Sequence, residues 1–226
     1  MTPTFSELLR PTEFADLIQP SAMVQRLERM VDQRKPMNML FYGSPGVGKT
    51  TAARILLSKL DADYYEINGS KETGIDNVRK NIEGFCVTLP MYSDVKVCFI
   101  DECDYLSMNA QASLRALIEK CDHVRFLLTA NEIRKMHPAL KSRCLPICFD
   151  VGPLEAPEII NRLVPRYQEK LGKLGLQMDA QRLHEILYTS FPDLRAVANR
   201  LEFEALPTVD DAKGALALAE NRQKVH

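Results

Sequence analysis

Short apolar runs alternate with amphipathic stretches along the first two thirds of the chain. From residue 38 the apolar runs are rich in branched and aromatic side chains, a pattern typical of strands buried on both faces. The predicted strands are residues 39–42, 63–67, 95–100, 124–129 and 146–149. Between them, apolar residues recur at helical spacing over residues 48–60, 75–87 and 107–121. Strands separated by helices of this length predict a three-layer α/β domain with a mainly parallel sheet.

The pattern changes at Gly152 and Pro153, after which only helical spacing remains. Apolar residues recur at three- and four-residue intervals over residues 159–171, 183–187 and 194–201. We therefore expect an α/β domain over residues 1–152 and a small all-helical domain over residues 153–226, with a hinge at residues 151–153.

Two further signals concern the helices of the second domain. Ser190 stands three residues before Asp193, which is the spacing of a capping box, and this predicts the start of the third helix. A final helix is expected over residues 209–221.

Composition and charge exclude several classes of protein. The chain has 226 residues, of which 46% are apolar and 26% charged, as is typical of a globular protein. Its longest apolar runs are about four residues, whereas a membrane helix needs about 20, and its N-terminus lacks the features of a signal peptide. We therefore expect a cytoplasmic protein without a membrane partner. The net charge of −1 provides no bulk positive field, so any contact with nucleic acid must use a local patch.

The six cysteines are expected to be reduced and buried. No Cys-x-x-Cys pair occurs, the nearest spacing being that of Cys144 and Cys148, and the four histidines do not cluster near the cysteines in the sequence. The sequence therefore favours free thiols over a zinc site.

The clearest chemical signal is the segment Gly-Ser-Pro-Gly-Val-Gly-Lys-Thr, which ends at Thr50 and stands between a predicted strand and a predicted helix. It fits the phosphate-loop pattern, in which backbone N–H groups cradle the phosphates of a nucleotide. Lys49 would reach the β and γ phosphates, and Thr50 would hold Mg²⁺. A glycine-rich turn is the alternative, but a chance match is of order 1%. The predicted ATP-binding residues are Gly43, Ser44, Pro45, Gly46, Val47, Gly48, Lys49 and Thr50 of this segment, together with Thr51, which follows it.

Two acidic residues follow the predicted strand at 95–100. Carboxylates at the C-terminal end of a buried strand emerge where α/β sheets bind ligands. Asp101 would support Mg²⁺, and Glu102 would polarise the water that attacks the γ-phosphate. A solvated acidic turn is the alternative, and the phosphate loop upstream favours the catalytic interpretation.

With these motifs, the chain resembles the AAA+ ATPase subunits of sliding-clamp loaders, namely the small replication factor C subunits and the T4-type phage subunits. The resemblance extends over residues 9 to about 204. Arg10 and Pro11 are similar to the family's segment beside the adenine, and Ala110 to Glu119 to its central helix. Residues 129–131 resemble sensor 1, 142–144 the arginine-finger motif, and 191–195 sensor 2 in a form closer to the phage subunits.

The resemblance implies roles for three further residues. Asn131 would position the lytic water, although an asparagine here is also typical of a helix N-cap. Arg143 would enter the site of a neighbouring subunit and stabilise transition-state charge, unless it is an ordinary surface arginine. Arg195 would touch the γ-phosphate of its own subunit; the alternative is an ordinary charge on the surface of the all-helical domain. The predicted catalytic residues are thus Glu102, Asn131, Arg143 and Arg195.

Candidate DNA contacts also come from the resemblance. Family members track a DNA backbone from positions on two helices, and the corresponding residues here are Arg79, Lys80, Asn109, Gln111 and Arg115. Ala110, Leu114, Leu117 and Cys121 give the central helix one buried face, which leaves Gln111 and Arg115 elsewhere. A charged helix surface is usually only solvated. For these residues the sequence therefore supports a DNA contact and an ordinary solvated surface equally.

The sequence therefore predicts an ATPase that couples ATP and Mg²⁺ binding to loading of a sliding clamp on primed DNA, with the clamp and other loader subunits as partners. The resemblance implies that a third domain, helical and of about 90 residues, follows the small all-helical domain in family members. The 226 residues of this sequence do not include it. We expect the protein to function as an oligomer and this short chain to be a monomer when dilute. We expect its location to be the cytoplasm of a bacterium or of a phage-infected host cell. The alternatives are another AAA+ DNA-processing ATPase, of the branch-migration or replication-maintenance type, and a nucleotide-binding scaffold without turnover.

Overall fold

A five-stranded parallel sheet organises the first two thirds of the chain. The computed structural model describes residues 4–71, 75–88 and 93–205. The strands are β1 (Met39–Tyr42), β2 (Asp63–Asn68), β3 (Lys96–Asp101), β4 (Val124–Ala130) and β5 (Leu145–Cys148). Every strand pair is parallel and the order is β2-β3-β4-β1-β5, which confirms the predicted sheet and all five predicted strands.

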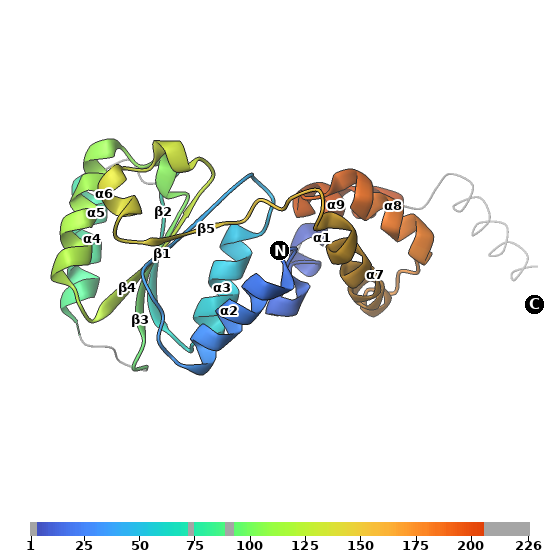
Figure 1. The fold of residues 1–226 in the computed structure, drawn as a ribbon, viewed down its shortest axis with the longest axis horizontal. Helices are drawn as coiled ribbons and strands as arrows, with labels where there is room; N and C mark the ends of the chain where they lie inside the picture. Colours follow the sequence, from blue (N-terminus) through green and yellow to red (C-terminus); the bar gives the residue numbers. More distant parts are fainter. Residues whose placement is uncertain (1–3, 72–74, 89–92, 206–226) are drawn as a thin grey trace, which may run out of the picture.

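Helices cover both faces of the sheet, as the sequence predicts. Figure 1 shows α4 (Ile75–Val87), α5 (Met108–Lys120) and the short α6 (Pro138–Lys141) on one side, and α2 (Ser21–Asp32) and α3 (Lys49–Lys59) on the other. Short helical turns complete this part, namely α1 (Phe5–Leu8), η1 (Phe14–Asp16), η2 (Cys103–Tyr105) and η3 (Ile133–Lys135).

Strands β1, β3 and β4 are buried on both faces, because their successive side chains point to opposite sides and each side is covered by helices. Phe41 and Phe99 pack toward α2 and α3, in a cluster that continues into the C-terminal helices. Leu40 and Ile100, their neighbours in sequence, pack toward α4 and α5. Two apolar clusters therefore enclose the sheet, and its polar chemistry is confined to the ends of the strands.

The C-terminal part of the described chain is all-helical. It consists of α7 (Ala156–Lys173), α8 (Ala180–Ser190) and α9 (Leu194–Ala205). Helix α8 packs against α7 and α9, and Figure 1 shows α9 beside α1. The boundary at residue 152 stays a prediction, and the helix expected at 209–221 lies outside the described residues. No helix in the described ranges has both the length and the apolar character needed to span a membrane.

The predicted capping box at Ser190 was wrong. Ser190 is the last residue of α8, and the cap of α9 is Asp193, whose Oδ1 accepts the backbone N–H groups of Arg195 and Ala196 at 2.9 and 3.2 Å. Pro192 restricts Phe191 to an extended conformation, with ψ at 139°. Asp193 is therefore the first residue after the proline that can begin a helix.

Candidate nucleotide-binding site

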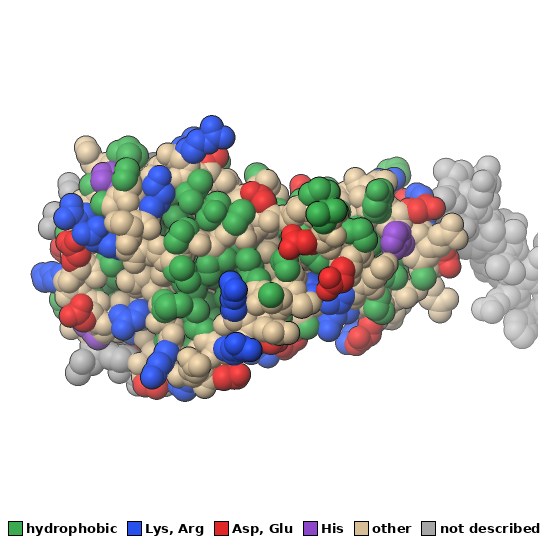
Figure 2. Space-filling view, viewed as in Figure 1, with side chains coloured by type: hydrophobic (Ala, Val, Ile, Leu, Met, Phe, Trp, Pro, Cys, Tyr) green, Lys and Arg blue, Asp and Glu red, His purple; other side chains and the backbone are tan. Residues whose placement is uncertain are grey.

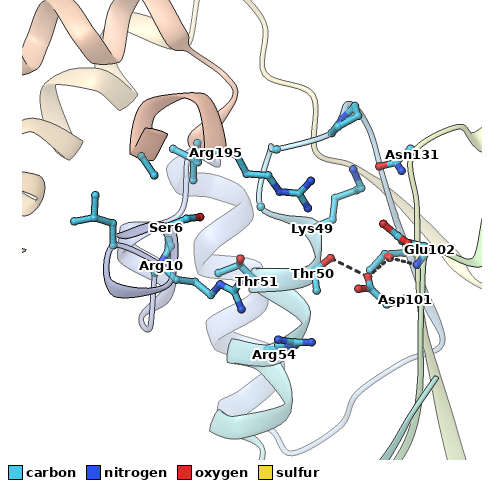
Figure 3. A pocket seen from close by; sticks show the side chains of 18 of the residues that line it. Ser6, Arg10, Lys49, Thr50, Thr51, Arg54, Asp101, Glu102, Asn131 and Arg195 are labelled. Atoms are coloured by element: carbon cyan, nitrogen blue, oxygen red, sulfur yellow. Dashed lines mark hydrogen bonds between the residues drawn. The ribbon is translucent and has the colours of Figure 1, made fainter. Parts of the chain in front are cut away.

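A cavity of about 290 Å³ lies where β1, β3 and β4 end, at the N-terminus of α3 (Figure 3). Its second wall comes from the N-terminal segment and from α9, which contribute Arg10 and Arg195. Most of the predicted site residues therefore meet in one hollow. The predicted residues that line it are Arg10, Pro11, Pro45, Gly46, Gly48, Lys49, Thr50, Thr51, Asp101, Glu102, Asn131 and Arg195.

The phosphate loop wraps around the side chain of Lys49. Its Nζ donates to the carbonyl oxygens of Gly43 and Ser44, at 2.6 and 2.8 Å. Gly48 adopts φ 90° and ψ 16°, which places the turn into α3 in the left-handed region that glycine tolerates best. The Val47 side chain packs in the core, 1% exposed, so only its backbone is available to a ligand.

Charge around Lys49 is balanced by carboxylates. Burial lowers the pKa of Lys49 below its ordinary value, while Asp104 and Asp150 raise it. Asp150 also accepts the backbone N–H of Ser44 at 2.6 Å and so braces the loop. The buried ammonium of Lys49 and the N-terminus of α3 are both positive. Together they favour the binding of a polyphosphate.

Two oxygen ligands stand together at the end of β3. Thr50 Oγ1 donates to Asp101 Oδ1 at 2.8 Å, and Thr129 Oγ1 donates to the same oxygen at 2.6 Å. A hydroxyl and a carboxylate are donors that Mg²⁺ prefers, so this pair fits the ion. Within the described ranges, no group of three or more His, Cys, Asp or Glu side chains could hold a metal ion. A magnesium ion here would therefore share its coordination with phosphate and water.

Glu102 lies at a strained turn. Its φ of 54° and ψ of 44° are left-handed, a conformation that costs a residue other than glycine about 1–3 kcal/mol. The turn is held by two bonds, from Glu102 N to Thr129 Oγ1 at 2.9 Å and from Gly69 N to the Asp101 carbonyl at 2.8 Å. The neighbouring structure thus fixes the backbone from which the Glu102 side chain enters the cavity.

Asp104 is a residue of this region that the sequence analysis did not single out. It is 8% exposed, and its Oδ2 accepts the backbone N–H groups of Asn131 and Glu132 at 3.1 and 3.0 Å. The other oxygen, Oδ1, is buried without a hydrogen-bond partner. The N-cap of η3 is Glu132, so Asn131 does not occupy the alternative N-cap position. Asp104 therefore holds the loop that presents Asn131 to the cavity.

The two arginines of the predicted catalytic set lie in different places. Arg195 lines the cavity from the first turn of α9 (Figure 3). Arg143 does not line it, and its guanidinium pairs with Glu119 of α5, with Nε 2.8 Å from Oε1. Arg143 also donates to the Ala139 carbonyl at 3.0 Å. Within one chain, Arg143 is separate from the other catalytic candidates.

The candidate DNA contacts do not share one environment. Lys80, Asn109 and Arg115 are exposed, while the side chain of Arg79 lies outside the described residues. The expectation that Gln111 lies away from the buried face of the central helix was wrong. Gln111 is 0% exposed, because its amide joins the Leu106 and Lys135 carbonyls to the backbone N–H of His137. Gln111 is therefore no candidate for a DNA contact.

Comparisons with known proteins give a family match and several similar curated proteins. Residues 39–149 match the family described as "ATPase family associated with various cellular activities (AAA)". The replication factor C small subunit of Methanococcus maripaludis is 34% identical over 206 residues, which cover 88% of this chain and 64% of that protein. A probable replication factor C subunit 5 of Dictyostelium discoideum is 31% identical over 214 residues, covering 91% and 60%. The chain thus spans less than two thirds of the length of these relatives.

Among solved structures, the RuvB Holliday junction branch migration motor of Thermotoga maritima has a similar fold. The TM-score is 0.55 with 21% identity, over 90% of this chain and 75% of that one. The chain therefore has the AAA type of phosphate-loop fold.

Proposed function

We propose that this chain, in which residues 39–149 match the AAA family of ATPases, is an ATP-hydrolysing subunit of a sliding-clamp loader. The observation that carries the proposal is the meeting of Lys49, Thr50, Asp101, Glu102 and Asn131 at one cavity, in a chain 34% identical to a replication factor C small subunit. Binding groups and a candidate base thus lie at the same end of the sheet.

Each group has a distinct role in the proposed hydrolysis. Lys49 exchanges its bonds to the loop carbonyls for the β and γ phosphates of ATP, and the loop N–H groups bind the same oxygens. Thr50 and Asp101 would hold Mg²⁺, which would neutralise charge on the phosphates. Glu102 orients and polarises the attacking water, and Asn131 fixes the position of that water beside the γ-phosphate.

The C-terminal helices and a neighbouring subunit complete the proposed site. Arg195 binds the γ-phosphate from α9, so the position of this helix reports the nucleotide state. Arg143 acts on the ATP of an adjacent subunit, where it stabilises charge that develops during transfer. This assignment requires an oligomer. The partners are other loader subunits, the sliding clamp and primed DNA. Lys80, Asn109 and Arg115 would contact the phosphate backbone of this DNA.

A second candidate function is that of a branch-migration type of ATPase. The likeness to RuvB, at 21% identity, concerns the fold alone, so this candidate ranks second to the clamp-loader proposal. A scaffold that binds ATP without turnover is the third candidate, and the position of Glu102 on the cavity wall argues against it.

ATPase rates with different effectors separate these candidates. A clamp-loader subunit should hydrolyse ATP faster with its cognate loader subunits, the clamp and a primer-template junction together than with any one alone. Stimulation by four-way junction DNA without a clamp would favour the branch-migration type. Absence of turnover with every effector, despite ATP binding, would leave the scaffold.

A further inference from the structure

A second hollow lies on the face shown in Figure 2, between α2 and the edge strand β5. Its volume is about 830 Å³, and we call it the α2–β5 groove. Figure 2 shows apolar side chains gathered over these elements. The apolar residues that line the groove are Met23, Leu27, Met30, Met37, Leu145, Pro146 and Ile147. Met37 and Leu145 are 49% and 46% exposed, so the groove presents accessible apolar surface.

The rim of the α2–β5 groove is cationic. Arg26, Arg29 and Lys35 line it, and none of its lining residues is acidic. The described part of the chain provides no ion pair for any of the three. Elsewhere cations do find partners, as Arg34 does with Asp94. Three unpaired cations around an apolar floor favour a partner that carries carboxylates beside an apolar surface.

The positive charge continues into a neighbouring hollow of about 600 Å³. Lys35 and Met37 line both hollows, which are therefore contiguous. The second hollow lies at the N-terminal ends of β3 and β4, at the opposite end of the sheet from the nucleotide site. Its ionisable residues are Arg34, Lys35, Asp94, Lys96, His123 and Arg125. Because Arg34 is paired with Asp94 and Lys96 is buried, Arg125 is the further cation that a ligand in the groove would meet at this end.

The backbone of β5 limits how a partner can bind. Leu145 and Phe149 donate their N–H groups toward β1, to the carbonyls of Asn38 and Tyr42 at 2.8 and 2.7 Å. Because alternate residues face opposite edges, Pro146 and Cys148 face outward, and Pro146 has no N–H. Only one outward donor remains, so a partner strand would pair poorly. Side chains that fill the groove must provide the affinity.

We propose that the α2–β5 groove is a docking site for an acidic amphipathic helix of another protein. The apolar face of that helix would lie on Met30, Met37 and Ile147, because methionine side chains adapt to the shape of an apolar partner. Its carboxylates would meet Arg26, Arg29 and Lys35. The proposal does not depend on the assignment of the chain as a clamp-loader subunit.

The test uses a synthetic peptide and the full chain. The probe is a fluorescent helical peptide of about 14 residues, with leucine at i, i+3, i+4 and i+7 and glutamate elsewhere. A matched peptide carries lysine in place of every glutamate. Fluorescence anisotropy should show saturable binding of the glutamate peptide, at least about tenfold tighter than binding of the lysine peptide and weakened by added salt.

Variants locate the binding surface. Met37→Glu changes a half-exposed loop residue, so the chain should still fold, and Lys35→Glu reverses a charge that both hollows share. Each should weaken binding of the glutamate peptide by about tenfold or more. The control is Met108→Glu, because Met108 is 52% exposed and distant in sequence from the groove; it should bind as the parent does. No saturation at about 1 mM glutamate peptide, equal binding of the lysine peptide, or unchanged affinity in Met37→Glu would each overturn the proposal.

Discussion

Leu194 donates its backbone N–H to the carbonyl oxygen of Gly46 over 3.1 Å, and this bond joins the first turn of α9 to the phosphate loop. Asp193, the cap of α9, packs so closely on the loop that a Cβ at Gly46 would lie 2.0 Å from its Oδ1. Arg195, one residue further on, lines the cavity. The phosphate loop and the first turn of α9 are therefore in direct contact. Displacement of either element would move side chains that line the cavity.

Gly46→Ala should impair ATP binding. Gly46 has φ +81°, so alanine is strained there, and its Cβ must displace Asp193. We expect ATP affinity to fall by about tenfold or more in calorimetric titrations. The control is Gly84→Ala, since Gly84 lies in α4 with no atom within 4 Å of an added Cβ. That change should leave ATP affinity intact and raise the free energy of unfolding by about 0.4–1 kcal/mol. Parent-like affinity in Gly46→Ala would mean that the contact with α9 has no role in binding.

Lys49→Ala and Glu102→Gln should fail in different steps. Lys49 holds the loop and faces the phosphates, so its loss should abolish ATP binding. Glu102→Gln keeps the shape of the site and removes the base, so it should bind ATP and lose at least about a hundredfold in turnover. Nucleotide affinity and turnover of both variants decide the matter. Near-normal turnover in Glu102→Gln would remove the glutamate from the mechanism.

Asp104→Asn should alter the pH profile as well as the rate. The carboxylate holds the Asn131 loop and raises the pKa of Lys49 against the effect of burial. Without its charge, the pKa of Lys49 falls further, and Lys49 loses its proton at a lower pH. The high-pH limb of kcat/KM, which reports the free enzyme, should therefore move to lower pH.

The matched control for Asp104 is Asp94→Asn, which removes a carboxylate from an exposed ion pair with Arg34. It should leave the pH profile unchanged. A reduced rate with an unmoved limb in Asp104→Asn would restrict Asp104 to holding the loop.

The sequence predicted the parts of the site that are contiguous in the chain. The phosphate loop, Asp101 and Glu102 stand in short motifs beside strands, and their local context determines where they point. Gln111 could not be placed by periodicity, because its partners at Lys135 and His137 come from a loop more than 20 residues away in the chain, where its amide satisfies buried backbone groups.

The second wall of the cavity could not be predicted from the sequence, because its residues too are brought together only by the tertiary fold. Ser6, Tyr167 and Ala198 line it from three separate elements, and no local spacing connects them. Asp104 carried a signal, as the last acid of the run that begins at Asp101, but its bonds to the loop after β4 depend on the order of the strands.

Thiol reactivity should single out Cys148. It is exposed, so the expectation that all six cysteines are buried was wrong for Cys148, whereas the other five cysteines are buried. Burial raises the pKa of Cys144 to about 12, and burial together with Cys121 raises the pKa of Cys86 to about 12. Iodoacetamide at about pH 8 should therefore modify one thiol in the folded chain and six after denaturation, as counted by mass spectrometry. Cys148→Ser should abolish the fast reaction, and rapid modification of a second thiol in the folded chain would contradict the burial pattern.

Arg143→Ala should separate binding from turnover. In the described chain Arg143 pairs with Glu119, a hydrogen bond that holds the pKa of this carboxyl below its ordinary value, and it lies away from its own cavity. If the arginine serves a neighbouring subunit, its loss leaves ATP affinity nearly intact and lowers turnover. Turnover per subunit in the parent should rise with protein concentration, because association creates the complete site. Arg143→Ala should flatten that rise.

Glu119 provides a second arm of the same test. If Glu119 holds the guanidinium ready for the neighbour, Glu119→Gln should lower turnover less than Arg143→Ala, and the double variant should equal Arg143→Ala alone. The control is Arg200→Ala, because Arg200 is an exposed arginine of α9 that bonds Thr189; it should keep the concentration dependence of the parent. Sedimentation over the same concentration range shows whether association and turnover rise together. A monomer with full, concentration-independent turnover that is insensitive to Arg143→Ala would exclude action across an interface.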